Sequence, residues 1–445
     1  METKIVKIPI RKPLGRFLAP KGDAAAATLR LERWEVDVED RDALAALEEA
    51  GRYLRETDTP VAFPTETVYG LGADATRSGS VRGIYAAKGR PLDNPLIVHV
   101  SDLEMLRGLL QGRQPQNGHQ QPKIPKRYEP LIERFWPGPL TILLPNPQSS
   151  QLAPEVTAGL PTFGARMPST SLALSLIKLA GVPLAAPSAN ASTKPSPTTA
   201  HHVKHDLDGR IELILDGGPC EVGVESTVVD GLCDPPVVLR PGGVGIEELR
   251  SCPGWENVTK AYKDQSEEGK DAPRAPGMKY KHYSPRAKVV LYESSCQVGK
   301  RGIDATDAES MKTPLPNGNS IPTNDHHLPT VGIIRTRRWS SGAGVKHGEL
   351  KQLSDNAING QEDKTTTYRV FYSAILDANG QGIGKLLDID LGKETRVIAQ
   401  GLFSALRELD QRGADMIFVD GIDDDVDIAA AVMNRLRKAA SQIRS

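Results

Sequence analysis

The sequence predicts an α/β protein with two domains, and three observations support this prediction. The chain of 445 residues is long enough for two or three domains. Short segments rich in Val, Ile and Leu alternate with segments in which apolar residues recur every three to four positions, the pattern of strands alternating with helices. Polar stretches rich in Pro, Gln, Ser and Gly interrupt this alternation and mark inserts and linkers.

These polar stretches divide the chain into four parts. We expect a basic N-terminal extension over residues 1–40, with regular structure beginning near Asp40, and a larger domain over 41–255. A linker over 256–286 and a smaller domain over 287–445 follow. Inside the larger domain, the Gln- and Pro-rich segment 111–127 is a predicted disordered insert. Further polar inserts interrupt the smaller domain.

Elements of the larger domain follow from hydrophobic spacing. Three leucines on one face predict a helix over residues 42–55, and residues 61–63 then form a predicted buried strand. A second helix is predicted over 81–87. A rigid, proline-rich turn leads into a predicted strand over 142–144.

The smaller domain has its own alternating pattern. Aliphatic and β-branched residues predict strands over 288–292, 330–334 and 416–419, and apolar periodicity predicts helices over 398–409 and 428–436. Strands that alternate with helices favour a small parallel sheet.

Composition excludes several classes of protein. Lys and Arg number 55 against 56 Asp and Glu, so a nucleic-acid contact would need a local basic patch. Four cysteines without a CxxC pair argue against a structural zinc site or a disulfide framework, and favour a reducing compartment. No run of 18 apolar residues is present, so we expect no membrane span. We expect a cytoplasmic protein. The basic N-terminus leaves mitochondrial targeting as the less favoured alternative, because its prolines would break an amphipathic helix.

Six polar clusters follow predicted strands or turns, where ligands bind in open α/β sheets. They are FPTETVYGLGADA (63–75), KGRPLDNPLIVHV (88–100), WPGPLT (136–141), GARMP (164–168), PSANASTKPSPT (187–198), and ESTVVDG (225–231) with VLRPGG (238–243).

The chemistry of these clusters suits a phosphorylated ligand. Arg90, Arg166 and Arg240 can each grip phosphate or carboxylate oxygens with two hydrogen bonds, and Lys88 adds a point charge. Lys88 and Arg90 could equally be cations at a helix C-terminus, where the helix dipole favours them. The serines read as hydrogen-bond donors, because no GxSxG elbow is present. No set of His, Cys and Asp suggests a catalytic transition metal. The residues alone therefore predict binding of a phosphorylated ligand with a hydroxylated or amino-acid part.

In this order, the six clusters resemble the threonylcarbamoyl-AMP synthase family, whose catalytic core is a YrdC-like domain. APGMKYKHYSP (275–285) resembles the connector of the long, two-domain form. The resemblance implies an open twisted mixed sheet with helices, followed by a smaller Rossmann-like α/β domain. One departure is the segment 191–193, where the family more often has a glycine before the lysine.

The resemblance also implies an activity. The family is a nucleotidyltransferase that makes L-threonylcarbamoyl-AMP from L-threonine, bicarbonate and ATP, with release of pyrophosphate. The product serves threonylcarbamoyladenosine modification of tRNA next to the anticodon. Mg²⁺ is expected with ATP, held mainly by phosphate oxygens and water rather than by a protein metal site. Expected partners are a downstream threonylcarbamoyl transferase complex and RNA, as tRNA or double-stranded RNA.

Carried over residue by residue, the resemblance implies two subsites. The threonine subsite comprises Thr67, His99, Arg166, Ala186 and Ser226. The ATP subsite comprises Arg90, Asn94, Thr162, Ser188, Ser196, Arg240 and, as a lid from the connector, Tyr283. Lys88 and Arg90 are the implied catalytic residues, beside the phosphates.

Two alternatives remain at this point. The first is a double-stranded RNA-binding module without catalysis, which predicts strongly salt-dependent RNA affinity and no pyrophosphate release. The second is carbamoyl transfer in hydrogenase maturation, where a YrdC-like domain also occurs. That activity would need zinc-finger segments, and no CxxC pair is present to supply them.

Overall fold

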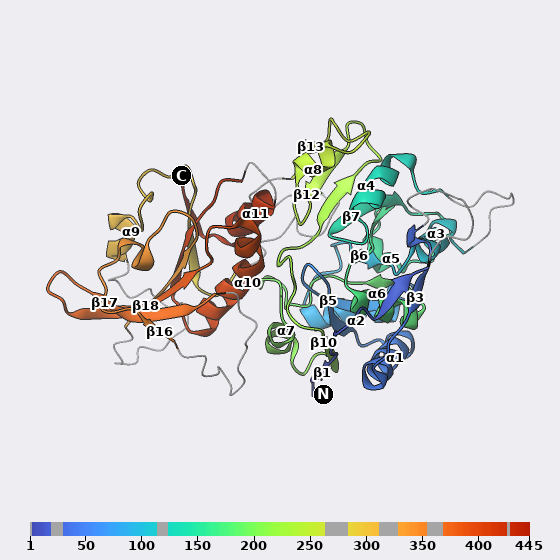
Figure 1. Ribbon diagram of the computed structural model, residues 1–445, viewed down its shortest axis with the longest axis horizontal. Helices are drawn as coiled ribbons and strands as arrows, with labels where there is room; N and C mark the ends of the chain where they lie inside the picture. Colours follow the sequence, from blue (N-terminus) through green and yellow to red (C-terminus); the bar gives the residue numbers. More distant parts are fainter. Residues whose placement is uncertain are drawn as a thin grey trace. The chain divides into compact units, whose positions relative to one another are not determined.

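The computed structural model describes residues 2–18, 30–113, 123–262, 284–310, 328–353, 368–424 and 428–445. Its internal contacts separate two compact units (Figure 1). The larger unit comprises residues 1–280 with 426–431, and the smaller unit comprises 281–425 with 432–445. Within the described ranges, no helix is both long and apolar enough to cross a membrane.

The larger unit is built on an 11-stranded mixed sheet. Across the sheet its strands are β1 (Lys4–Lys7), β10 (Leu213–Asp216), β4 (Val61–Pro64), β5 (Tyr69–Asp74), β9 (Leu184–Ala185), β6 (Ile97–His99), β8 (Thr162–Arg166), β7 (Leu140–Pro145), β11 (Thr227–Asp230), β12 (Val237–Arg240) and β13 (Thr259–Lys260). Strands β2 (Gly15–Phe17) and β3 (Trp34–Val36) form a separate antiparallel pair. The mixed sheet with helices is the predicted fold class.

Helices connect these strands. They are α1 (Arg41–Glu56), α2 (Ser78–Lys88), α3 (Leu103–Gln111), α4 (Glu129–Phe135), α5 (Pro154–Thr157), α6 (Ser171–Ala180), α7 (Ala200–Leu207) and α8 (Ile246–Arg250), with a 3₁₀ turn at Lys126–Tyr128. The Asp40 side chain caps α1 by accepting hydrogen bonds from the backbone nitrogens of Asp42 and Ala43. Helix α2 ends at Gly89, whose φ of 60° suits glycine because a Cβ would be strained there. Helix α1 and strand β4 confirm the predicted helix 42–55 and strand 61–63.

The expected start of regular structure is wrong, and the predicted insert has bounds that are too wide. Strand β1 pairs in parallel with β10, so regular structure begins near Lys4 rather than near Asp40. Residues 4–7 are the edge of the main sheet, and not part of a loose extension. The predicted insert 111–127 is ordered at both ends, where α3 reaches Gln111 and a 3₁₀ turn begins at Lys126; residues 114–122 lie outside the described part.

The smaller unit contains a 7-stranded sheet. Across it lie β16 (Lys351–Gln352), β17 (Val370–Leu376), β18 (Gly382–Asp390), β15 (Thr330–Arg335), β19 (Met416–Asp420), β14 (Lys288–Tyr292) and β20 (Gln442–Arg444). The helices are α9 (Ala305–Ser310), α10 (Thr395–Gln411) and residues 432–439 of α11 (Ala429–Ala439). The predicted strands β14, β15 and β19 are parallel to their neighbours in the sheet, as expected. The sheet is not wholly parallel, because β16 and β17 add an antiparallel edge.

Helix α10 lies close against one face of this sheet. A Cβ at Gly332 in the middle of β15 would lie 2.8 Å from a methyl group of Leu409 on α10. Any larger residue at this position would force the Leu409 side chain to shift.

Candidate active site

Three residues of the predicted threonine subsite, His99, Arg166 and Ala186, lie on or directly beside neighbouring strands in the middle of the main sheet. Strands β6 and β8 are parallel, and their register pairs His99 with Arg166, the last residue of each strand. Ala186 follows β9 immediately, and its backbone nitrogen donates to the Ile97 carbonyl oxygen at 3.0 Å. The sheet register therefore brings residues far apart in sequence to one place.

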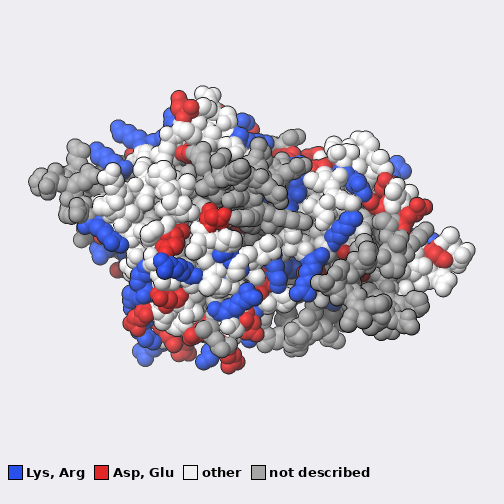
Figure 2. All heavy atoms as spheres, turned by 180° about the vertical axis from the view of Figure 1, so that it is seen from behind, with Lys and Arg blue, Asp and Glu red and all other residues white. Residues whose placement is uncertain are grey.

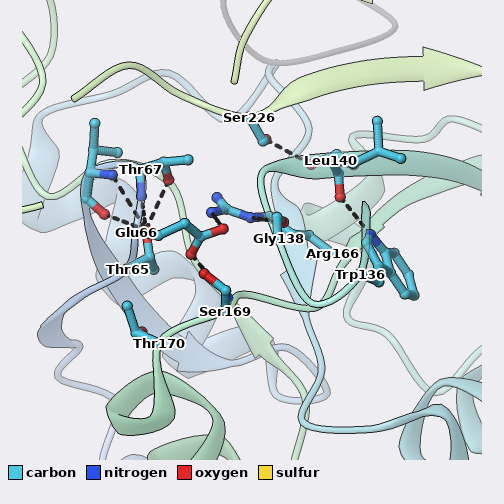
Figure 3. Close-up of polar contacts among 12 residues, drawn as sticks. Thr65, Glu66, Thr67, Trp136, Gly138, Leu140, Arg166, Ser169, Thr170 and Ser226 are labelled. Atoms are coloured by element: carbon cyan, nitrogen blue, oxygen red, sulfur yellow. Dashed lines mark hydrogen bonds and ion pairs between the residues drawn. The ribbon is translucent and has the colours of Figure 1, made fainter. Parts of the chain in front are cut away.

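Arg166 is held by a buried ion pair (Figure 3). Its Nη2 lies 2.7 Å from Oε1 of Glu66, and its Nε donates to the Gly138 carbonyl oxygen at 3.3 Å. The other carboxylate oxygen of Glu66 accepts from the backbone nitrogen of Ser169 at 3.1 Å. Arg166 and Glu66 are 4 % and 3 % exposed, so both charges depend on these partners.

His99 is a neutral hydrogen-bonding group. Burial and the positive charges of Arg166 and Arg240 lower the pKa of His99 to about 3. Its Nδ1 lies 3.3 Å from the Ile97 carbonyl oxygen, which can only accept, so Nδ1 carries the proton. Nε2 is then an acceptor, able to receive a hydrogen bond from a hydroxyl or an amine.

Ser226 joins the two predicted subsites. The guanidinium of Arg240, a predicted ATP residue, donates from Nη2 to the Ser226 carbonyl oxygen at 2.9 Å and to Ser226 Oγ at 3.0 Å. Ser226 Oγ also lies 2.8 Å from Oγ1 of Thr141, a fully buried residue of β7. With two neighbours in place, Ser226 Oγ has one hydrogen-bonding position left for a ligand.

Thr67 lies in the turn between β4 and β5. Its Oγ1 is 2.9 Å from Oγ1 of Thr65, which in turn donates to the Val68 carbonyl oxygen (Figure 3). The Thr67 carbonyl oxygen accepts from the backbone nitrogen of Gly223. This bond ties the turn to the segment that leads to Ser226. Thr67, the remaining residue of the predicted threonine subsite, is thereby anchored near Ser226.

Lys88 is enclosed by carbonyl groups. Its Nζ donates to the carbonyl oxygen of Ser188 and, at 2.6 Å, to that of Asn190. The Lys88 carbonyl oxygen accepts from the backbone nitrogen of Ser192 at 2.9 Å. Lys88 therefore fastens the end of α2 to the loop that carries Ser188, and the predicted catalytic role remains a prediction.

Asn94 carries a fully buried side-chain amide that has no hydrogen-bond partner among the described residues. An unpaired buried amide is costly, so it indicates a place where a ligand supplies the partner. The Tyr85 hydroxyl donates to the Asn94 carbonyl oxygen at 2.6 Å and fixes the backbone there. Thr162 is the first residue of β8, where the register pairs it with Pro145 of β7.

The remaining ATP residues flank these positions. Arg90 follows the left-handed Gly89, and its backbone nitrogen donates to the Tyr85 carbonyl oxygen at 3.0 Å. Ser196 Oγ donates to Oε1 of the buried Glu225 at 2.5 Å. Tyr283, the predicted lid, lies outside the described residues.

Sequence reasoning did not assign roles to three residues of this site: Glu66, Thr141 and Glu225. Each lies inside a recognised cluster, and each contacts or adjoins a predicted threonine or ATP residue. For Glu66 and Glu225 the sequence did hold a signal: a carboxylate among small, apolar or hydroxyl residues needs a partner if it is buried.

The described residues contain no group of three or more His, Cys, Asp and Glu that could hold a metal ion. The four cysteines form no disulfide. The site is thus built from cations, hydroxyls, a neutral imidazole and two buried carboxylates, Glu66 and Glu225. This set can bind an amino acid and a phosphorylated group, and lacks an activated serine or cysteine nucleophile among its members.

Comparisons with known proteins agree with this chemistry. Residues 54–242 match the family model described as "Telomere recombination" (Sua5_yciO_yrdC), and residues 244–441 match "Threonylcarbamoyl-AMP synthase, C-terminal domain". The threonylcarbamoyl-AMP synthase of Schizosaccharomyces pombe is 42 % identical over 455 residues, covering 100 % of this chain and 98 % of the relative. That of Bacillus subtilis is 39 % identical over 414 residues, covering 93 % and 98 %.

A solved structure of Pyrococcus abyssi Sua5 complexed with L-threonine is also similar. It matches with a TM-score of 0.67 and 34 % identity, over 99 % of each chain. Both domain models, the full-length relatives and this structure agree with the resemblance seen in the six clusters. The chain therefore belongs to the threonylcarbamoyl-AMP synthase family, in its long, two-domain form.

Proposed function

We propose that the site on the central strands of the main sheet is where this chain makes L-threonylcarbamoyl-AMP, with bicarbonate as the source of the carbamoyl carbon. The chain is an enzyme of the nucleotidyltransferase type that acts on L-threonine and ATP, as its family membership indicates. The residue assignments, bicarbonate and the metal requirement are our proposal.

The proposed reaction has two steps. The threonine amine attacks the carbon of bicarbonate and water leaves, which gives a carbamate. A carbamate oxygen then attacks the α-phosphorus of ATP, and the bond to the β-phosphate breaks to release pyrophosphate. Both steps depend on positioning and charge neutralisation rather than on a protein nucleophile, which fits a site of arginines and hydroxyls.

The proposed roles follow from the contacts. Arg166 binds the threonine carboxylate, and the neutral His99 accepts a hydrogen bond from the threonine at Nε2. Thr67, Ala186 and Ser226 complete the threonine subsite. The ATP subsite consists of Arg90, Asn94, Thr162, Ser188, Ser196 and Arg240, with Tyr283 proposed as a lid. The observation that carries the proposal is the buried cluster of Arg166, His99, Ser226 and Arg240.

Magnesium enters this proposal as part of the substrate. Mg²⁺ bound to ATP neutralises charge on the phosphates and on the departing pyrophosphate. The described residues supply arginines rather than a carboxylate cluster, a donor set that suits a metal ion carried by phosphate oxygens and water.

We further propose a cytoplasmic enzyme whose product passes to a threonylcarbamoyl transferase complex acting on tRNA. Four free cysteines support a reducing compartment. A direct RNA contact would need a basic surface patch. In Figure 2, acidic side chains lie among the basic ones on the described part of the face shown.

A substrate-omission assay tests the proposal. Purified protein with MgATP, L-threonine and bicarbonate should release pyrophosphate and form the adenylate, detected by mass spectrometry, and omission of any one substrate should stop both. Pyrophosphate release that does not depend on threonine would contradict the proposal. Salt-sensitive RNA binding without pyrophosphate release would favour the RNA-binding alternative.

A matched pair of variants tests the ATP subsite. Arg90→Ala should lower kcat/KM for ATP about tenfold or more, because phosphate oxygens lose a cation. Arg82→Ala is the control, since Arg82 is an exposed cation of α2 that pairs with Glu155 outside the predicted site. Equal losses in both variants would remove Arg90 from the subsite.

A further inference from the structure

Glu66 is a buried carboxylate to which the reaction proposed above gives no role. It lies between β4 and β5, flanked by Thr65 and Thr67, and is 3 % exposed. Removing a carboxylate from water costs several kcal/mol unless its oxygens are paired. The position of Glu66 therefore needs a reason, and its contacts supply one.

Both oxygens of Glu66 are fixed by groups from elsewhere in the unit (Figure 3). Oε1 lies 2.7 Å from Nη2 of Arg166, and Oε2 accepts from the backbone nitrogen of Ser169 at 3.1 Å. The Glu66 carbonyl oxygen accepts from the backbone nitrogen of Val222 at 2.8 Å. With its backbone and both carboxylate oxygens fixed, Glu66 is a rigid anchor.

The contacts of Arg166 show what this anchor does. A guanidinium is a planar fork with five N–H donors. The edge formed by Nε and Nη2 is taken by the Gly138 carbonyl oxygen and Glu66. Nη1 has no partner among the described residues, so the end of the fork formed by Nη1 and the second hydrogen of Nη2 is left for a ligand. That end matches the two oxygens of a carboxylate.

We propose that Glu66 is a positioning residue for the amino-acid substrate. It holds the Arg166 guanidinium so that Nη1 and Nη2 can each donate a hydrogen bond to one oxygen of the threonine carboxylate. This inference rests on the proposed assignment of Arg166 to the threonine subsite. Without the negative charge, the guanidinium loses the partner that sets its orientation. Glu66 then governs recognition of the carboxylate without touching it.

The test compares two ligands on three variants. L-Threonine and L-threonine amide, which lacks the carboxylate charge, are titrated calorimetrically into the full chain and into Glu66→Gln and Glu66→Asp. The control is Glu32→Gln, because Glu32 forms an ion pair with Arg107 in the same unit and contacts none of the predicted site residues. ATP affinity and thermal melts are recorded for every protein.

We expect the unaltered chain to bind threonine at least tenfold more tightly than the amide. Glu66→Gln should weaken threonine binding about tenfold and shrink that ratio, with ATP affinity within about twofold. Glu66→Asp, which keeps the charge, should restore part of the ratio. Glu32→Gln should leave it unchanged. A purely structural ion pair would lower the melting temperature and leave the ratio as it was.

The outcomes separate the two levels of the argument. Equal binding of threonine and its amide by the unaltered chain would overturn the carboxylate assignment of Arg166. Discrimination that persists undiminished in Glu66→Gln would overturn the role of Glu66 alone. If Glu66→Gln does not fold, the ratio in Glu66→Asp decides: a full ratio overturns the proposal, because the shorter side chain cannot hold the fork in the same place.

Discussion

Replacing His99 with glutamine should reduce the loss in unfolding free energy that the larger unit undergoes as the pH falls below about 6.5. Burial and the charges of Arg166 and Arg240 lower the pKa of His99 from 6.5 to about 3 in the folded chain. In the unfolded chain the imidazole titrates near its ordinary value. Stability from the neutral imidazole is therefore fully present above about pH 6.5 and is lost as the pH falls toward 3.

The size of this effect follows from proton linkage. Between about pH 6 and pH 4 the unfolded chain binds one more proton at this histidine than the folded chain does. The free energy of unfolding then falls by about 1.4 kcal/mol per pH unit from this group alone. Over the whole window, from the ordinary pKa of 6.5 to the folded value of about 3, the loss is roughly 5 kcal/mol. Glutamine keeps a hydrogen-bonding side chain but does not titrate, so the variant should lack this slope.

Urea unfolding at about pH 7, 6, 5 and 4 measures the difference. Tryptophan fluorescence reports mainly the larger unit, which contains Trp34, Trp136 and Trp255 of the four tryptophans. His201→Gln is the control, because His201 is exposed on α7 and should follow the parent profile. Parallel profiles of the parent and His99→Gln would refute the reasoning, since they would mean that the folded chain protonates His99 as readily as the unfolded chain.

Three further predictions test other features. Asn94→Leu should stabilise the ligand-free protein by about 1 kcal/mol, since it removes a buried amide without a partner, and should weaken ATP binding at least fivefold; a destabilised variant with unchanged ATP affinity in melting and calorimetry would contradict this. Thr193→Gly should raise the unfolding free energy by up to ~1 kcal/mol in urea titration, because Thr193 has a φ of 77°, which a β-branched residue tolerates poorly; a loss of stability would be the opposite result. Deletion of residues 2–8 should lower the melting temperature of the larger unit, because β10 loses one of its two parallel neighbours, and an unchanged melt would show that β1 contributes nothing to stability.

Elements with a strong local pattern were predictable from sequence. The helix over residues 42–55 and the strand over 61–63 correspond to α1 and β4, since an amphipathic helix and a buried aliphatic strand each carry their own periodicity. Strand β1 carries no such signal. It has two lysines and two aliphatic residues, and only its pairing with residues 213–216 makes it a strand.

For the site as well, the sequence identifies functional groups but not the tertiary partners that orient them. The sequence identifies Arg166 as a residue for anions, yet the carboxylate that orients it lies 100 positions earlier, at Glu66. Likewise, Lys88 has the composition of a phosphate clamp, whereas its ammonium group is surrounded by carbonyl oxygens of a loop that follows β9. Spacing along the chain reports which groups are present, and tertiary contacts decide which of them are left for a ligand.

The pairing of β1 with β10 has a consequence for synthesis on the ribosome. The two strands lie more than two hundred residues apart in the chain, which corresponds to about 10–40 s of translation at ~5–20 residues per second. Throughout that interval β1 lacks β10, its neighbour in the sheet, and the side of β4 that later pairs with β10 stays open. Residues 4–7 should therefore become protected from proteolysis only after residues 213–216 have left the ribosome and paired with them.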